Sequence, residues 1–255
     1  MKHPKASHYV AGWRLFFITV FLLTIGTVLP NAYAQDSDAE RAQFLELKIK
    51  GENGDAEAQY TVTSRYFSGI GVGKDLKEAM KWCRKAAEQN LAKAQVTMAL
   101  GYYYGSVVEK DYKEAAHWCR KAADQNHPVA LYQLGVLYAQ GAGVSKDEKE
   151  AVNWYLKASE QNVIGAHSML GWCYANGVGV DKDYSEAYAW YSLAMEELLK
   201  PGVGGDKNMQ DVVKQVMRQR EALLDKISPQ QLLDAQNRQA ALQNLIEAKK
   251  KISKK

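Results

Sequence analysis

A glycine-rich stretch that ends in lysine, GIGVGK at residues 69–74, has the composition of a phosphate-binding loop. In such a loop the glycines let backbone N–H groups approach a phosphate, and the lysine neutralises its charge. That loop normally follows a strand, whereas the residues before Gly69 have helical periodicity. The stretch also returns as GAGVSK at 141–146 and GVGVDK at 177–182. This recurrence favours a turn between helices over a nucleotide site.

The other residues that could carry chemistry form no recognisable pattern. Beyond residue 34, His117, His127 and His167 lack the i, i+4 spacing of a helical metal site, and neither HExxH nor CxxC occurs. Serine, histidine and aspartate are all present, but a catalytic triad is recognised by its geometry. We therefore predict no enzyme activity, no catalytic residue, no metal and no cofactor.

Residues 1–34 have the pattern of a signal peptide. Three basic residues precede an apolar run at 15–29, and AYA at 32–34 provides a small-x-small cleavage pattern. The alternative, a retained membrane anchor, would need a longer apolar run. We expect an exported mature chain that starts at Gln35, is periplasmic with secretion as the alternative, and has no membrane anchor.

The charge of the chain argues against nucleic-acid binding. The formal charge of +4 includes three positive charges of the signal peptide, so the mature chain carries about +1. Five lysines lie at 249–251 and 254–255, which leaves the rest of the chain mildly acidic, without a basic surface for nucleic acid. We interpret the lysine tail as a solvated helix end, with contact to an anionic envelope component or membrane surface as the alternative.

One segment of the chain recurs four times at a constant interval. Its tryptophans stand 36 residues apart, at Trp82, Trp118, Trp154 and Trp190, and each follows a Lys-Asp pair and a Glu-Ala pair. A fixed period in this range predicts a solenoid, in which each repeat must stack on its neighbours to bury its apolar face.

Each tryptophan segment has the features of an amphipathic helix. Apolar residues follow the i, i+3, i+4, i+7 spacing of one helical face, as in Ala79, Trp82, Cys83 and Ala86. The predicted start is a capping box, with Glu three residues after Asp, as in Asp75 and Glu78. The predicted ends are residues that tolerate the left-handed conformation, namely Asn90, Asn126 and Asn162, with Gly54 at the equivalent place before the first repeat.

A first helix precedes each tryptophan helix. Its small, apolar and tyrosine residues at i, i+4 and i+8 share one face, as in Ala58, Val62 and Tyr66. Val107 takes the place of a turn glycine in the second repeat, so we expect a differently shaped loop there. The four predicted repeats are residues 55–90, 91–126, 127–162 and 163–198, and together they form a domain at 55–198.

Two stretches resemble Sel1-like repeats, relatives of the tetratricopeptide repeat: AEAQY…YFSGIGVGKDLKEAMKWCRKAAEQN and ALYQLGVLYAQGAGVSKDEKEAVNWYLKASEQN. The resemblance covers residue 55 to about residue 194. It implies an all-α fold, a right-handed α/α superhelical solenoid whose first helices line the concave side. It also implies a scaffold or adaptor for proteins or peptides in envelope assembly, signalling or host interaction. Some cysteine-rich relatives are described as β-lactamase-like hydrolases, so such an enzyme is the alternative, although we find no residues here that would carry it.

The segments outside the repeats are predicted to cap the solenoid. Residues 35–54 form an N-terminal helix with a capping box at Ser37 and an apolar side of Phe44, Leu45, Leu47 and Ile49. Residues 199–255 form the C-terminal cap and basic tail, with a helix at 206–227 and another from Ser228-Pro229. The residues available for the apolar sides of these two helices are Met209, Val212, Val213, Val216, Leu223, Leu224, Leu232, Leu233, Ala235, Leu242, Leu245 and Ile246.

Cys83, Cys119 and Cys173 are an odd number of cysteines in an exported chain. Cys83 and Cys119 occupy equivalent places in adjacent repeats, where helices stand ~8–10 Å apart. A disulfide needs its Cα atoms within ~7 Å. Cysteine-rich relatives join the two helices within one repeat, and no repeat here has a second cysteine. We predict no intramolecular disulfide.

Partner selectivity is expected where the repeats differ on the exposed side of the first helices. The stripe opposite the alanine-to-tyrosine face holds the predicted protein-binding residues, which are Tyr60, Ser64, Leu100, Tyr104, Tyr132, Val136, Gln140, Met169, Trp172 and Asn176. Aromatic anchors of this kind dominate protein interfaces, and a groove with a polar rim suits a peptide or helix. The alternative is that Leu100, Val136 and Trp172 only pack between repeats.

Overall fold

The computed structural model describes residues 38–201 and 207–252. Over these residues the chain is all-α, with eleven α-helices, one 3₁₀ helix and no strand. The predicted signal peptide, the Ser37 cap and the glycine-rich break at 202–206 lie outside the described residues. The helices are α2 (Asp38–Glu52), α3 (Ala56–Ser68), α4 (Leu76–Glu88), α5 (Ala92–Tyr104), α6 (Tyr112–Asp124), α7 (Pro128–Gln140), α8 (Glu148–Ser159), α9 (Ile164–Asn176), α10 (Tyr184–Leu198), α11 (Lys207–Glu221), η1 (Leu224–Lys226) and α12 (Pro229–Ile252).

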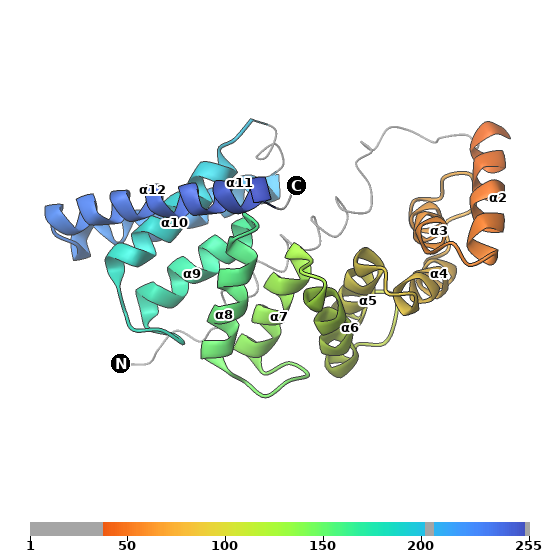
Figure 1. The fold of residues 1–255 in the computed structure, drawn as a ribbon, viewed down its shortest axis with the longest axis horizontal. Helices are drawn as coiled ribbons and strands as arrows, with labels where there is room; N and C mark the ends of the chain where they lie inside the picture. The colour runs from red at the N-terminus through yellow and green to blue at the C-terminus, as the bar shows by residue number, and fades with distance from the viewer. Residues whose placement is uncertain (1–37, 202–206, 253–255) are drawn as a thin grey trace. The chain divides into compact units, whose positions relative to one another are not determined.

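These helices belong to two compact units. The N-terminal unit is residues 38–130 with 142–144, and the C-terminal unit is residues 131–141, 145–201 and 207–252. In the N-terminal unit α2 packs on α3, α3 on α4, α4 on α5 and α5 on α6. In the C-terminal unit α8 packs on α9 and α9 on α10, while α11 and α12 both pack on α10. Within each unit, Figure 1 shows these helices following one another along the ribbon, as a repeat array requires.

The predicted aspartate caps are confirmed at the start of every tryptophan helix. The side chains of Asp75, Asp111, Asp147 and Asp183 accept hydrogen bonds from backbone N–H groups two or three residues later. The helices end as predicted too, since Asn90, Asn126 and Asn162 have φ of 66°, 59° and 62°, and Gly54 has φ of 97°.

The second half of the predicted capping box is wrong in these helices. The backbone N–H of Asp111 donates to the Tyr102 carbonyl of the preceding helix at 3.1 Å, and Asp183 does the same to Tyr174 at 2.9 Å. The cap N–H therefore already has an acceptor in the first helix of its own repeat. The glutamate takes another role: Glu114 accepts from the indole N–H of Trp118 at 3.2 Å, and Glu186 accepts from Trp190 at 3.0 Å.

The glycine-rich stretches are tight interhelical turns. Gly71, Gly143 and Gly179 have φ near +70°, where side chains are strained. A Cβ atom on them would stand 2.3, 1.9 and 2.2 Å from the carbonyl oxygens of Glu40, Tyr112 and Glu148. Val107, at the equivalent place in the second repeat, is not among the described residues with positive φ. The second repeat therefore uses a different turn, as predicted.

Large side chains on the two helices of each repeat form the core. The four repeated tryptophans are buried, with 2–7% of their surface exposed. Val62, Met98, Leu134 and Leu170, which occupy one equivalent position on the first helices, are fully buried. Both predictions are confirmed, and apolar burial at these positions is the main source of stability.

Helix α2 stands where the second helix of a preceding repeat would be. Phe44 is buried and packs with Val62 and Trp82, and Leu47 packs against the same cluster. The prediction that Leu45 and Ile49 cover the first repeat is wrong, because they are 50% and 58% exposed. They lie 36 residues before Lys81 and Lys85, which are exposed on α4, so the shared register directs them to solvent.

The C-terminal cap differs in part from its prediction. The helix predicted at 206–227 ends at Glu221 and is followed by η1. The capping box at the start of α12 is confirmed, since Ser228 Oγ accepts from Gln231 N–H at 3.2 Å and Gln231 Oε1 accepts from Ser228 N–H at 2.9 Å. Of the residues predicted for the apolar sides of this cap, Val212, Val216, Leu223, Ala235, Leu242 and Ile246 are buried, whereas Leu224, Leu233 and Leu245 are exposed.

Candidate interaction surface

In the N-terminal unit the predicted stripe runs along α3 and α5. The Tyr60 hydroxyl lies 3.3 Å from Thr97 Oγ1, and the Ser64 hydroxyl donates to the Tyr60 carbonyl. Leu100 is only 2% exposed, so the prediction that it is accessible is wrong. Tyr104 is half-buried at the end of α5, where its ring meets Tyr103 edge to face at 5.0 Å.

In the C-terminal unit the stripe runs along α7 and α9. Tyr132 is 1% exposed and its ring lies 5.6 Å from that of Tyr155, so its predicted accessibility is also wrong. Met169 and Trp172 are half-buried on α9. Asn176 is exposed, and its side chain donates to the Trp172 carbonyl at 2.8 Å. Val136 and Gln140 are half-buried near the end of α7.

Burial along the stripe depends on the position within the helix. Near the start of α5, α7 and α9 the stripe is closed, since Val96, Tyr132 and Ser168 are all buried, whereas the equivalent Tyr60 of α3 is half-buried. In the last turn it opens, and Ser68, Tyr104, Gln140 and Asn176 are half-buried or exposed. The most exposed part of the candidate surface therefore lies, in each unit, at the C-terminal ends of the first helices.

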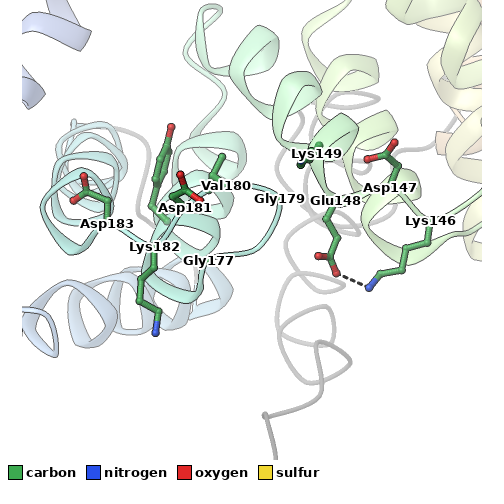
Figure 2. A pocket seen from close by; sticks show the side chains of 11 residues that line it. Lys146, Asp147, Glu148, Lys149, Gly177, Gly179, Val180, Asp181, Lys182 and Asp183 are labelled. Carbon is green, nitrogen blue, oxygen red and sulfur yellow. Dashed lines mark hydrogen bonds and ion pairs between the residues drawn. The ribbon is translucent and has the colours of Figure 1, made fainter.

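A second feature, which no sequence pattern predicted, is an open cleft of about 1050 Å³ in the C-terminal unit (Figure 2). Its walls are the loop before α8 and the loop before α10, with Tyr174 and Gly177 at the end of α9. Alternating charges in the KDEK and DKD segments are the only signal that could have indicated it. The lining residues are Lys146, Asp147, Glu148, Lys149, Tyr174, Gly177, Gly179, Val180, Asp181, Lys182 and Asp183.

Several charges of this cleft already have partners. Lys146 Nζ lies 2.5 Å from Glu148 Oε1, the pair joined in Figure 2. Asp147 accepts from the N–H of Glu150 at 3.0 Å, and Asp183 accepts from Ser185 and Glu186 N–H groups. The cleft is therefore a polar groove between helix starts, with two of its carboxylates used as helix caps.

The structure explains the glycines of the stretch at residues 69–74, which has the composition of a phosphate-binding loop. The turn at 69–74 connects α3 to α4, and the Glu40 carbonyl of α2 occupies the space next to Gly71. A backbone carbonyl, which carries partial negative charge, lies where a bound phosphate would need backbone donors. The glycines are thus accounted for by helix packing.

The cysteine thiols take part in packing between repeats. Cys83 Sγ donates to the Ala94 carbonyl at 3.4 Å, and Cys119 Sγ donates to the Ala130 carbonyl at 3.2 Å. All three cysteines are free and buried. Burial raises the pKa of Cys83 and of Cys173 to about 12, so these thiols are protonated at neutral pH and are poor nucleophiles.

His167 is completely buried in α9, and its Nε2 lies 3.3 Å from the Ser159 carbonyl. Burial lowers the pKa of its imidazole to about 4, so the ring is neutral at pH 7. His117 is exposed beside Trp118, and His127 is half-buried. In the part of the chain that the structure describes, no three His, Cys, Asp or Glu side chains form a group that could hold a metal ion.

The Sel1 repeat model matches residues 56–91, 92–127, 128–163 and 164–197, which is more than half of the chain. The chain belongs to the Sel1 repeat family. Proteins of this family generally act as protein-interaction scaffolds.

Solved Sel1-type structures share the fold. The protective antigen c5321 of uropathogenic Escherichia coli is 36% identical, with a TM-score of 0.59 over 70% of this chain and 40% of that one. A Sel1 repeat protein from Oxalobacter formigenes is 32% identical, with a TM-score of 0.57 over 72% of this chain and 80% of that one.

A shorter match is to the putative Sel1-like repeat-containing protein L18 of Acanthamoeba polyphaga mimivirus, 39% identical over 44 residues. This match covers 17% of this chain and 8% of the viral protein. The chain thus spans well under half of both L18 and c5321. Within residues 38–201 and 207–252, no helix is long and apolar enough to cross a bilayer.

Proposed function

We propose that this Sel1-repeat protein is an exported scaffold that binds a protein or peptide at the C-terminal ends of its first helices. Export and a periplasmic location rest on the signal-peptide pattern of residues 1–34. A role in envelope assembly, signalling or host interaction is part of the same proposal. Family membership supports the scaffold role, and the open end of the stripe supports the place of binding.

The observation that carries the proposal is a pair of aromatic side chains that the fold does not require. Trp172 stands where the first and third repeats have Ser64 and Val136, and all three are half-buried. Tyr104 stands where another repeat has Ser68. Other repeats carry smaller side chains at these positions, so the large rings would add contact area for a bound partner.

The polar residues at the C-terminal ends of the first helices indicate the kind of partner. Asn176 and Gln140 place amide groups in the last turns of α9 and α7, and Ser64 and Ser68 do the same with hydroxyls on α3. An aromatic anchor beside neutral polar groups suits an extended or helical peptide with one apolar anchor residue. Because these amide and hydroxyl groups are neutral, they should select only weakly for the charge of that peptide.

Two matched substitutions test the proposal. Tyr104→Ser and Trp172→Ser introduce residues that other repeats carry at the same positions, so we expect small losses of thermal stability. Each variant and wild type would be crosslinked in the native envelope fraction and the captured protein quantified. Lys113→Ser, on the exposed side of α6, is the control.

Loss of capture in either aromatic variant, with the melting temperature and the control unchanged, supports the proposal. Unchanged capture in both variants contradicts it. N-terminal sequencing of the purified native protein tests the export part separately, because cleavage after Ala34 leaves Gln35 as the first residue.

A further inference from the structure

One position in the first helices makes the same hydrogen bond with two different side chains. Gln59 Nε2 donates to the Gly51 carbonyl at 2.8 Å, and Gln95 Nε2 donates to the Ala87 carbonyl at 3.1 Å. In the fourth repeat His167 has replaced the glutamine, and its Nε2 lies 3.3 Å from the Ser159 carbonyl. Each acceptor belongs to the last turn of the preceding helix, where carbonyls lack partners within the helix.

The replacement makes this position titratable. A neutral imidazole with its proton on Nε2 donates to a carbonyl as glutamine does. Protonation would add a second N–H at Nδ1, an atom that is buried and has no hydrogen-bond partner among the residues that the structure describes. His167 is fully buried and its ring lies 5.8 Å from that of Trp190, so the added charge would also stand against an aromatic core.

The charged groups around His167 come from other helices, because neither α9 nor α7 carries a charged side chain. Glu197 of α10 favours the protonated ring and Lys250 of α12 opposes it. At the end of α8, Glu160 is paired with Lys249 of α12 at 2.5 Å. The hydrogen bond to the Ser159 carbonyl also favours the protonated ring, but burial, which lowers the pKa, is the largest influence.

We propose that His167 is a built-in acid sensor, which loosens the packing of α9 on α8 and α10 in mild acid. The equivalent side chains of the first two repeats, Gln59 and Gln95, do not titrate. The loosening caused by His167 is therefore expected in the C-terminal unit.

The direction of the effect follows from proton binding. His167 has a pKa of about 4 in the folded chain and an ordinary value of 6.5 once exposed. Above pH 6.5 both states are neutral and histidine contributes nothing to the pH dependence. Between pH 6.5 and about 4 only the opened state takes up the proton, so stability falls as the pH falls. At pH 5 this favours opening by roughly 30-fold.

Hydrogen exchange of the full chain, read by mass spectrometry, tests the proposal. Wild type and His167→Gln would be compared at the same pH, first at pH 7 and then at pH 5. His167→Gln restores the side chain of the first two repeats, so it keeps a donor for the Ser159 carbonyl. His117→Gln is the control, because this histidine is exposed.

We expect peptides of α8, α9 and α10 to exchange roughly 20-fold faster in wild type than in His167→Gln at pH 5, relative to their ratio at pH 7. Peptides of α3 to α6 should show no such difference, and His117→Gln should behave as wild type. Equal pH dependence in wild type and His167→Gln would overturn the proposal. A histidine NMR titration of wild type gives a second test that needs no variant, and titration of His167 near pH 6.5 would also overturn it.

Discussion

The aspartate at the start of each second helix hydrogen-bonds to both helices of its repeat, through its side chain to the second helix and through its backbone N–H to the first. Asp111 Oδ1 accepts from the N–H groups of Lys113 and Glu114 at 2.8 and 3.1 Å. Its own N–H donates to the Tyr102 carbonyl of α5. The side chain therefore satisfies donors at the N-terminus of α6, and the backbone holds that end against α5.

Replacing Asp111 with alanine should remove the side-chain bonds and keep the backbone bond. We expect a loss of ~0.5–2 kcal/mol in the free energy of unfolding, measured by urea denaturation. Asp124→Ala, in the last turn of the same helix, is the matched control. An acidic residue at a helix C-terminus is unfavourable, so that change should be neutral or slightly stabilising. Equal losses in the two variants would argue against the cap.

At the scale of an element, the interhelical turn sets how closely successive repeats approach. The turn after α9 brings Gly179 against the carbonyl of Glu148 at the start of α8, and Gly143 approaches Tyr112 of α6 in the same way. A residue with a side chain has no room there. The turn is thus a packing surface as well as a connection.

Gly179→Ala should destabilise the protein by more than about 2 kcal/mol. The new Cβ would stand 2.2 Å from a backbone carbonyl, and alanine at φ of +71° costs about 1–2 kcal/mol before any clash. Gly73→Ala is the control, because a Cβ there meets nothing within 4 Å. Thermal unfolding of both variants would measure the difference, and a harmless Gly179→Ala would refute the close approach.

Helix α12 offers a second comparison within one element. Leu242 is 6% exposed on the side that packs against α10, whereas Leu245 is 48% exposed. Leu242→Ala should cost about 2–5 kcal/mol in urea unfolding, because it leaves a cavity in the cap. Leu245→Ala should change the stability by less than about 1 kcal/mol. A larger cost for Leu245 would mean that α12 packs with another face.

At the scale of the whole molecule, contacts within each unit join helices that are close in sequence. The N-terminal unit follows the order α2 to α6, and in the C-terminal unit only α12 packs beyond its nearest neighbour, onto α10. Stability in such an array is approximately a sum of repeat terms and nearest-neighbour terms. A change in one repeat should therefore be felt mainly in that repeat and the next.

Trp118→Ala should cost ~3–5 kcal/mol, because the ring is 4% exposed and its N–H bonds to Glu114. Hydrogen exchange should rise most in α5 and α6 and least in α9 and α10. The half-buried Trp172, replaced by serine, should cost much less. A uniform rise of exchange over all helices would contradict nearest-neighbour stability.

The sequence by itself determined the helix order, the caps and the core. Asp at N-cap and Asn or Gly at the left-handed end are local signals, because they act on backbone groups within a few residues. The constant interval of 36 residues placed Trp82 and its three equivalents in one environment, and all four are buried. The recurrence of residues at this interval was decisive, since it distinguished the residues that every repeat needs for the fold from the residues that vary between repeats.

Only the tertiary structure decided which of the differing residues are accessible. Leu100 and Val136 share one position of the stripe, yet Leu100 is buried and Val136 is not fully covered. Burial there depends on how closely neighbouring helices approach, which no local pattern records. The same holds for Glu114, which was predicted to accept from the backbone N–H of Asp111. That N–H donates to the Tyr102 carbonyl instead, and Glu114 accepts from the indole N–H of Trp118. It also holds for His167, whose burial against Trp190 is a property of packed helices rather than of spacing.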